Sequence, residues 1–530
     1  MRDELVSCSS TCRHRRLPGK VDTLLATFDS AVNLLHDPPR GNKQVAAAQT
    51  IKMNDSTHYA TAPEDRIPFH LKFVYGLGAF VNNMLADSIG RMLIVLNLGL
   101  GMNPALVGLL GALPRLTDAI TDPLMGYVSD NTRSRYGRRR PYMFIGAIFV
   151  GISFALLWQL PLGKSESWYF WYFLVGSLIF FLAYTIYATP WVALGYELTP
   201  DYHERTRLMG VQNFIGSIAY MISPYFLAIM YMPVFGDVVN GASYLALIIA
   251  AVAIGLGILP AIFLRERFKE IAEKEGSDKI SAGVWHVIKD FFHGFATTLK
   301  FKPFLKLCVA TFLVFYGFIL IAAFQSYVII YYVFGGDQEA GSVFVGHSGS
   351  VQAITALCVI AFITWLATKV GKRRAFFVST GISMVGYALK WFCYTPDNPW
   401  LVLIPAPFMA FGLAGLFTLM PSMICDVVDM DELNTHQRRE GMYGSIYWWV
   451  VKLGQSVAIF GGGLLLVWTG FDVELGGNQT EEALRLMRLS DAFIPCVASA
   501  IAIWAVASYS VTEEKAHEVR MELEARRGAA

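Results

Sequence analysis

Long apolar runs separated by short polar stretches occupy most of the chain after residue 70. A helix that crosses a bilayer needs about 20 predominantly apolar residues. Stretches of that kind begin near Phe73, Pro104, Pro141, Trp168, Leu208, Ser243, Pro303, Ser348, Ala375, Trp400, Met442 and Ala492. The pattern therefore predicts an all-α integral membrane protein with twelve transmembrane helices.

Basic residues gather in every second loop between these stretches. The loops after the second, fourth, eighth and tenth spans carry arginines and lysines, whereas the intervening loops hold little beyond Lys164, Arg485 and Arg488. Cytoplasmic loops are the ones enriched in Lys and Arg. We therefore expect both termini to be cytoplasmic, in a protein of the cell inner membrane.

The remaining polar segments divide the chain into five parts. Residues 1–66 lack an apolar core long enough for a secretory signal and are predicted to be a disordered cytoplasmic tail. Residues 67–264 and 303–511 each hold six spans. Residues 265–302 are predicted to be a cytoplasmic linker with an amphipathic helix, and residues 512–530 a solvated helical tail.

An internal repeat relates the two sets of spans. The segment YGRRRPYM, with its glycine at 137, recurs as VGKRRAFF, with its glycine at 371. ERTRLMG, ending at Gly210, recurs as RREGMYG, ending at Gly444. The shared offset predicts two pseudo-symmetric six-helix halves, the arrangement of major facilitator transporters, which bind substrate between the halves near the midplane.

Composition excludes several other classes of protein. Hydrophobic residues make up 55% of the chain and charged residues 16%, far from the composition of a soluble enzyme. A formal net charge of +2 is too balanced for a nucleic-acid partner. Seven cysteines without a CxxC pair predict neither a disulfide framework nor a zinc site, and no HExxH or GxSxG motif is present. We expect no enzymatic activity and no cofactor.

Ionisable residues inside membrane spans are costly and mark functional sites. In the first span Asn83 and Asp87 lie on one helix face, and in the second Arg115, Asp118 and Asp122 share a face. Two carboxylates one turn apart suit either a proton or a small hard cation such as Na+, and the sequence does not decide between them. The alternative is that these groups form ion pairs that lock helices together.

Lysines and aromatic residues in later spans complete the set. Lys452 in the eleventh span shares a face with Trp448, and Tyr447 precedes that tryptophan. Aromatic faces stack on sugar rings, although most membrane aromatics are packing groups. Lys306 and Lys390 lie near span ends, where a lysine side chain reaches water, and we expect no function for them.

Four segments carry a resemblance to a known family. RLTDAITDPLMGYVSDNTRSRYGRRRP at 115–141 closely resembles the second-helix signature of the glycoside–pentoside–hexuronide:cation symporters, the melibiose permease-like transporters. YGLGAF at 75–80, CDVVDMDELNTHQRREGMYGS at 425–445 and VVKLG at 450–454 resemble the family's first helix, its tenth-to-eleventh loop and its eleventh helix. The resemblance covers residues 70–512.

The resemblance implies a coupling-cation site. The family places Na+, Li+ or H+ at two second-helix aspartates, which match Asp118 and Asp122. A fourth-helix threonine matches Thr185, and an eleventh-helix lysine matches Lys452. The family's asparagine between the aspartates is Thr121 here, which still offers an oxygen.

The sugar-binding residues of the family are not retained. Its first-helix Lys-Asp pair falls on Asn82 and Asn83, its fourth-helix aspartate on Ala188, and its fifth-helix arginine on Asn213. Melibiose is therefore a poor candidate substrate. The candidate substrate-binding residues are Asn83, Asp87, Arg115, Asn213, Tyr447 and Trp448.

Charges at repeat-related positions of the cytoplasmic loops predict a gate. The candidates are Asp130, Arg133, Arg138, Arg139, Arg205, Asp429, Asp431, Arg438 and Arg439. Salt bridges between the halves would close the inner side and break when it opens. The alternative, that the basic residues only set topology, leaves the three aspartates unexplained.

Together these features predict a secondary transporter that couples Na+ or H+ to import of a glycoside, pentoside, hexuronide or related sugar by alternating access. Its partners would be a small-molecule substrate and the lipid bilayer, with no nucleic acid, and a monomer would suffice. Two alternatives stay open: a lysolipid-type carrier on the same fold, and a solute sensor that does not transport.

Overall fold

The computed structural model describes residues 65–132, 134–199, 202–266, 298, 300–435, 440–509, 511 and 513–528. All of them belong to one compact unit, Thr61–Ala530. The predicted tail 1–66 and linker 265–302 lie almost wholly outside the described residues, so their structure stays a prediction.

The first six spans are made by eight helices. Short breaks divide the first and fifth spans, which otherwise run as single rods. The helices are α2 (Phe69–Met92), α3 (Ile94–Leu98), α4 (Pro104–Asn131), α5 (Arg140–Leu157), α6 (Glu166–Glu197), α7 (Tyr202–Ile222), α8 (Phe226–Met230) and α9 (Val238–Phe263). The break before α8 is the turn Ser223–Tyr225, and its Pro224 lies at the boundary between the halves, against Gly349 of α13.

The second six spans repeat this plan. Their helices are α12 (Lys302–Tyr327), α13 (Gln338–Val370), α14 (Lys372–Cys393), α15 (Pro405–Thr435), α16 (Glu440–Trp468) and α17 (Glu481–Ala507). Eleven of the described spans are long and apolar enough to cross a membrane by composition alone. The remaining span, α4, is less apolar because Arg115, Asp118 and Asp122 lie within it. The predicted all-α fold of two six-helix halves is confirmed.

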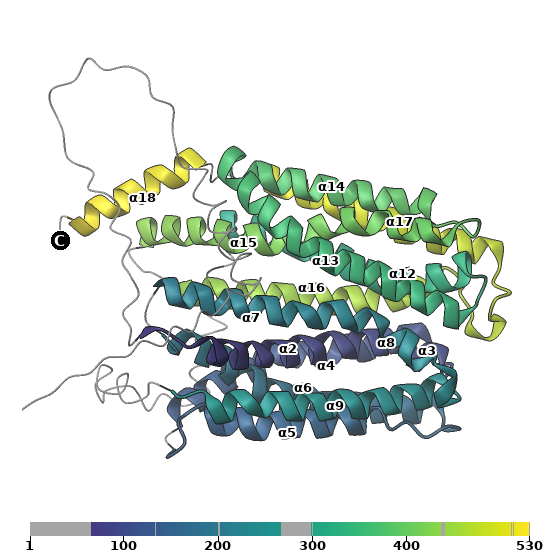
Figure 1. The fold of residues 1–530 in the computed structure, drawn as a ribbon. Coiled ribbons are helices and arrows are strands. Elements are labelled where there is room, and N and C mark those ends of the chain that lie inside the picture. The colour runs from purple at the N-terminus through teal and green to yellow at the C-terminus, as the bar shows by residue number, and fades with distance from the viewer. Residues whose placement is uncertain are drawn as a thin grey trace, which may run out of the picture. The chain divides into compact units, whose positions relative to one another are not determined.

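The helices of each half pack around one another, and a few helices join the halves. Figure 1 shows α5, α6 and α9 on one side of the bundle and α14 and α17 on the other. The halves meet where α4 packs on α16 and where α7 and α8 pack on α13. The central helices are therefore the ones that can line a site between the halves.

The halves are in close contact at the end of the bundle away from α18 (Glu513–Gly528), which we call the far end. A Cβ atom at Gly463 of α16 would lie 2.2 Å from the carbonyl oxygen of Pro104 on α4. The hydroxyl of Tyr327 donates to Asn97 Oδ1 at 2.9 Å, and the hydroxyl of Ser350 donates to the Met221 carbonyl at 2.7 Å. Backbone contact and buried hydrogen bonds thus close this end.

The helix α18 packs against α15 rather than lying free in water. Its residues Val519 and Leu523 are buried, whereas the sequence predicted a solvated helix. Two apolar side chains on a highly charged helix are too few to produce a clear helical period of hydrophobic residues, so the sequence does not predict that this helix packs against another.

The sequence predicts that Lys390 reaches water. In the structure this residue of α14 forms a buried ion pair instead. Its Nζ lies 2.5 Å from Asp491 Oδ1 on α17, and both side chains are at most 2% exposed. The ammonium group also lies 5.2 Å from the centre of the Tyr394 ring. The sequence does not predict this pair, because the position of a lysine near a span end does not say which neighbouring helix faces it.

This pair leads to a stability prediction. Asp491→Asn leaves the Lys390 ammonium buried without a counter-charge, and we expect a loss of about 3–5 kcal/mol in unfolding free energy. The double variant Lys390→Met/Asp491→Leu removes both charges and should recover most of it. Thermal unfolding in detergent checks both. A single variant that unfolds at the wild-type temperature would show that the pair contributes nothing.

Candidate functional site

Asp118, Asp122 and Lys452 form an ionic cluster between the halves, which we call the cation cluster. Lys452 Nζ of α16 lies 3.2 Å from Asp118 Oδ2 of α4 and also pairs with Asp122 Oδ2. The two aspartates lie one turn apart on α4, so both carboxylates face the same neighbouring helix. One ammonium group therefore bridges two carboxylates of the other half.

Threonine hydroxyls support the cluster from the side. The buried Thr185 of α6 donates its hydroxyl hydrogen to Asp122 Oδ1 at 3.0 Å. Thr121 Oγ1 lies 3.4 Å from Thr185 Oγ1. Asp118 is 3% exposed, and its Oδ1 has no hydrogen-bond partner among the described residues. The cluster thus offers several oxygen ligands of the kind that a hard cation requires, one of them unpartnered.

Arg115 links the halves one turn further toward the far end. Its Nη1 donates to Gln455 Oε1 of α16 at 2.9 Å, and its Nη2 donates to the Ala86 carbonyl of α2 at 3.1 Å. The guanidinium also lies 5.5 Å from the centre of the Phe181 ring. Arg115 and Gln455 follow the same helix faces as Asp118 and Lys452, so the two sets of contacts are adjacent.

A cavity of about 500 Å³ lies between the two halves, on the side of Arg115 that faces the far end. Its walls come from both halves: α2, α4, α7 and α8 on one side, and α12, α13, α15 and α16 on the other. Most lining residues are apolar. Its charged lining residues, among the described part of the chain, are Asp87, Arg91 and Arg115.

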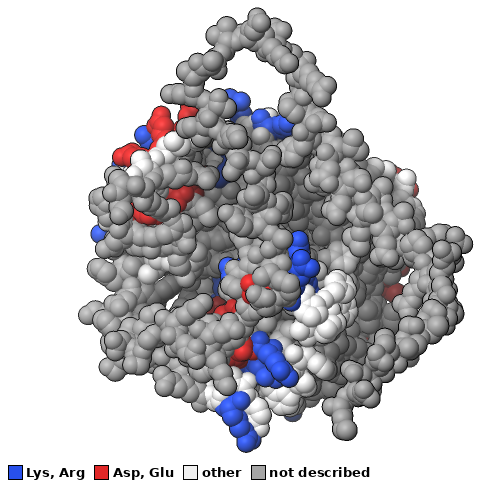
Figure 2. Space-filling view, turned by 60° about the vertical axis from the view of Figure 1, so that its left-hand side comes forward, with Lys and Arg blue, Asp and Glu red and all other residues white. Residues whose placement is uncertain are grey.

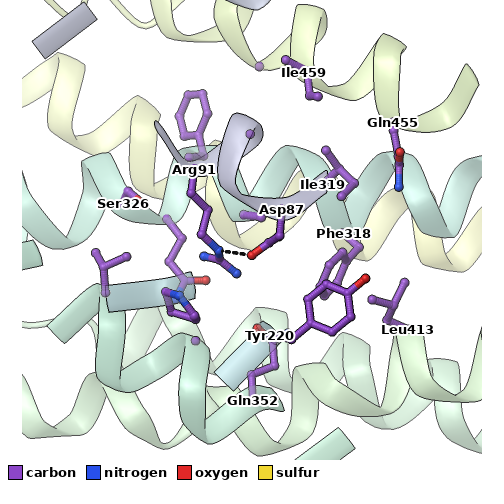
Figure 3. Close-up of a pocket in the computed structure, with 18 of the residues that line it drawn as sticks. Asp87, Arg91, Tyr220, Phe318, Ile319, Ser326, Gln352, Leu413, Gln455 and Ile459 are labelled. Carbon is purple, nitrogen blue, oxygen red and sulfur yellow. Dashed lines mark hydrogen bonds and ion pairs between the residues drawn. The ribbon is translucent and has the colours of Figure 1, made fainter. Parts of the chain in front are cut away.

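Asp87 and Arg91 form an ion pair on the cavity wall. Arg91 Nε lies 2.5 Å from Asp87 Oδ2, and the Ser223 hydroxyl donates to the same oxygen. Figure 3 shows this pair facing the space between Ile459 of α16 and Gln352 of α13. The wall is therefore apolar with a few convergent polar groups, the usual character of a small-molecule site.

The other candidate substrate-binding residues lie away from the cavity wall. The Asn83 side chain donates to the Gly216 carbonyl at 3.1 Å, which joins α2 to α7. Asn213 is exposed. Trp448 is 54% exposed, and Tyr447 is buried in the apolar core of the second half. Of the six candidates, the structure brings Asp87 and Arg115 together at the cavity.

Several polar lining residues were missed by sequence reasoning. Tyr220 and Gln352 are isolated polar residues within apolar runs, and Gln325 has only Ser326 as a polar neighbour. Each is a weak signal alone, because a lone polar residue in a span often bonds to its own helix.

Three of the gate candidates, Arg138, Arg139 and Arg205, contact residues of the first half. Arg138 and Arg139 both pair with Glu197 at the end of α6, and the distance from Arg139 Nη1 to Glu197 Oε1 is 2.8 Å. Arg205 donates to the Thr199 carbonyl at 3.2 Å. Figure 2 shows Lys and Arg side chains beside Asp and Glu side chains at the end of the bundle where α18 lies.

The remaining gate candidates are less fully described. Asp429 and Asp431 lie near the end of α15, where Asp431 is buried. The side chain of Asp130 and the residues Arg133, Arg438 and Arg439 lie outside what the structure describes. The predicted salt bridges between the halves stay a prediction.

The described helices, arranged in two halves around a central cavity, define a membrane transporter of the major facilitator class. A family model described as MFS/sugar transport protein matches residues 74–513, and the chain belongs to this family. The predicted resemblance to melibiose permease-like symporters is thereby confirmed. The matched family and its relatives are transporters rather than enzymes.

Relatives share the full length of the membrane part. The chain is 26% identical to an uncharacterized symporter of Synechocystis, over 87% of this chain and 98% of that protein. It is 22% identical to an isoprimeverose transporter of Lactiplantibacillus pentosus, over 84% and 90%. It is 23% identical to a sodium-dependent lysophosphatidylcholine symporter of Gallus gallus, over 87% and 90%.

Solved structures give the same fold. A bacterial homolog of the human lysosomal transporter Spinster, in an inward-facing and unoccupied conformation, superposes with a TM-score of 0.62 at 14% identity. The match covers 85% of this chain and 98% of that one.

Proposed function

We propose that the protein couples Na+ or H+ to import of a small solute by alternating access. The observation that carries this proposal is the bridge from the Lys452 ammonium to Asp118 and Asp122. An ammonium group held by two carboxylates of the opposite half occupies the position that a coupling cation would take.

In this mechanism the cation replaces Lys452 at the carboxylates. The oxygens of Asp118, Asp122, Thr121 and Thr185 would hold Na+, or one carboxylate would hold H+. Freed Lys452 no longer joins α16 to α4, so the two halves can change their relative orientation. Because coupling between two sites is reciprocal, substrate must tighten cation binding by the same factor that the cation tightens substrate binding.

We place the substrate in the cavity beside Arg115 and expect a glycoside, pentoside, hexuronide or related sugar. The isoprimeverose transporter among the relatives supports a sugar. A lysolipid-type carrier is the second candidate. It is supported by the mostly apolar cavity walls and by the relationship to the lysophosphatidylcholine symporter.

The proposed orientation puts the α18 end on the cytoplasmic side of the inner membrane and the far end on its outer side. The basic loop that contains Arg138 and Arg139 lies at the α18 end, as cytoplasmic loops do. The segments 67–264 and 303–511 would then act as the two moving halves of one monomer.

Uptake into liposomes that contain the purified protein tests the proposal. Labelled glycosides, pentosides, glucuronides and lysophosphatidylcholine are offered under an imposed Na+ gradient and, separately, under a pH gradient. We expect accumulation of one class under one gradient. Uptake that ignores both gradients would contradict symport, and binding without uptake would favour a sensor.

A further inference from the structure

Among the described residues, six charged side chains surround the cavity and the cation cluster, and their charges sum to zero. Asp87, Arg91 and Arg115 line the cavity. Asp118, Asp122 and Lys452 form the cluster at its inner end. Three carboxylates therefore balance three cationic groups when neither substrate nor coupling ion is bound.

Arg115 is the cavity-lining cation that lacks a carboxylate partner within the described chain. Asp87 already accepts from Arg91 and Ser223. Arg115 instead donates to two neutral acceptors, the Gln455 side chain and the Ala86 carbonyl. A guanidinium group carries five N–H donors, so donors remain for a ligand on the cavity side.

The coupling cation adds one positive charge to this balanced set. A net charge surrounded by apolar walls within a membrane is costly. The cluster and Arg115 lie one turn apart on α4, so the added charge appears beside Arg115. An acidic group on the substrate would restore neutrality when it binds to that guanidinium.

We infer that the cavity takes an amphipathic monoanion, with its acidic group on Arg115 and its apolar part along the far-end walls, and that transport is electroneutral. The inference rests on the proposed cation symport. Electrostatics then explains why each ligand favours the other: the cation creates the charge that the anion neutralises. A neutral sugar would instead leave one net charge in the membrane and make transport respond to membrane potential.

The test compares 4-nitrophenyl β-D-glucuronide with 4-nitrophenyl β-D-glucoside, which share the apolar group and differ in one carboxylate. Uptake into liposomes is driven by a cation gradient at membrane potentials clamped with valinomycin and K+. We expect cation-dependent uptake of the glucuronide at a rate independent of potential, and little uptake of the glucoside.

Three other outcomes would each overturn either the inference or the proposed symport. Cation-coupled, potential-driven uptake of the glucoside would overturn the inference and leave symport standing. Uptake of neither probe by folded protein would overturn the inference. Uptake of the glucuronide that ignores both cation gradients would instead overturn the proposed symport on which the inference rests.

Arg115 itself is tested by its effect on selectivity. Arg115→Gln should lower the ratio of glucuronide to glucoside binding by about thirtyfold or more, because a buried charge pair is lost. Arg115→Lys should recover part of that ratio, and Arg485→Gln at an exposed site on α17 should leave it unchanged. A merely structural role for Arg115 would lower the binding of both probes equally and leave the ratio intact.

Discussion

Asp122→Asn is expected to abolish accumulation of substrate against a gradient while exchange of substrate across the membrane continues. The change removes one of the two carboxylates that hold Lys452 and that would hold the coupling cation. Loss of one carboxylate from a buried ionic cluster weakens the binding of its cation by several kcal/mol. We therefore expect the affinity for the coupling cation to fall about a hundredfold or more. Exchange needs the substrate cavity and the moving halves, both of which remain.

Accumulation and exchange are measured on the same liposomes, and Asp426→Asn is the matched control. Asp426 also pairs with a lysine, Lys372 at 2.8 Å, but both of these residues belong to the second half. The control should accumulate substrate normally. Full accumulation by Asp122→Asn, or equal losses of accumulation and exchange, would contradict a coupling role for Asp122.

Gly463→Ala is expected to hold the far end open. Its Cβ would lie 2.2 Å from the Pro104 carbonyl oxygen, and backbone on both sides leaves no flexible side chain to move aside. Overpacking of this kind costs about 1–3 kcal/mol, which corresponds to a shift of about 5- to 150-fold in the balance between closed and open states. Uptake should fall because the cycle must pass through a closed far end.

Spin labels on the far-end loops measure this opening directly. Labels at Lys164 and Asp397, one in each half and both exposed, should show a longer distance in Gly463→Ala than in the wild type. Gly255→Ala in α9 is the control, since a Cβ there meets open space. An unchanged distance with normal uptake would show that close contact at Gly463 is not needed to close the far end.

The membrane fold was predictable because each span is a long apolar run, and because the 234-residue offset reveals the two halves. The cation cluster was also predictable in part. Asp118 and Asp122 had to share a helix face, and charges inside a membrane must find partners. That Lys452 bridges both carboxylates is information that required the structure.

The cavity walls could not be predicted because helical spacing shows which residues share a face but not which neighbour that face meets. Tyr447 adjoins Trp448 in the chain, yet it is buried in the core while Trp448 is exposed. For the same reason the sequence does not predict the pairing of Lys390 with Asp491, which lies 101 residues further along the chain.

The central proposal is that the cation cluster binds the coupling ion, and direct binding to the purified protein tests it most simply. Without substrate, Na+ binding is measured by isothermal titration calorimetry and proton binding by potentiometric titration, in the wild type and in Asp118→Asn/Asp122→Asn. We predict one saturable Na+ or one exchangeable proton in the wild type and its loss in the double variant. The same binding in both proteins would contradict the assignment.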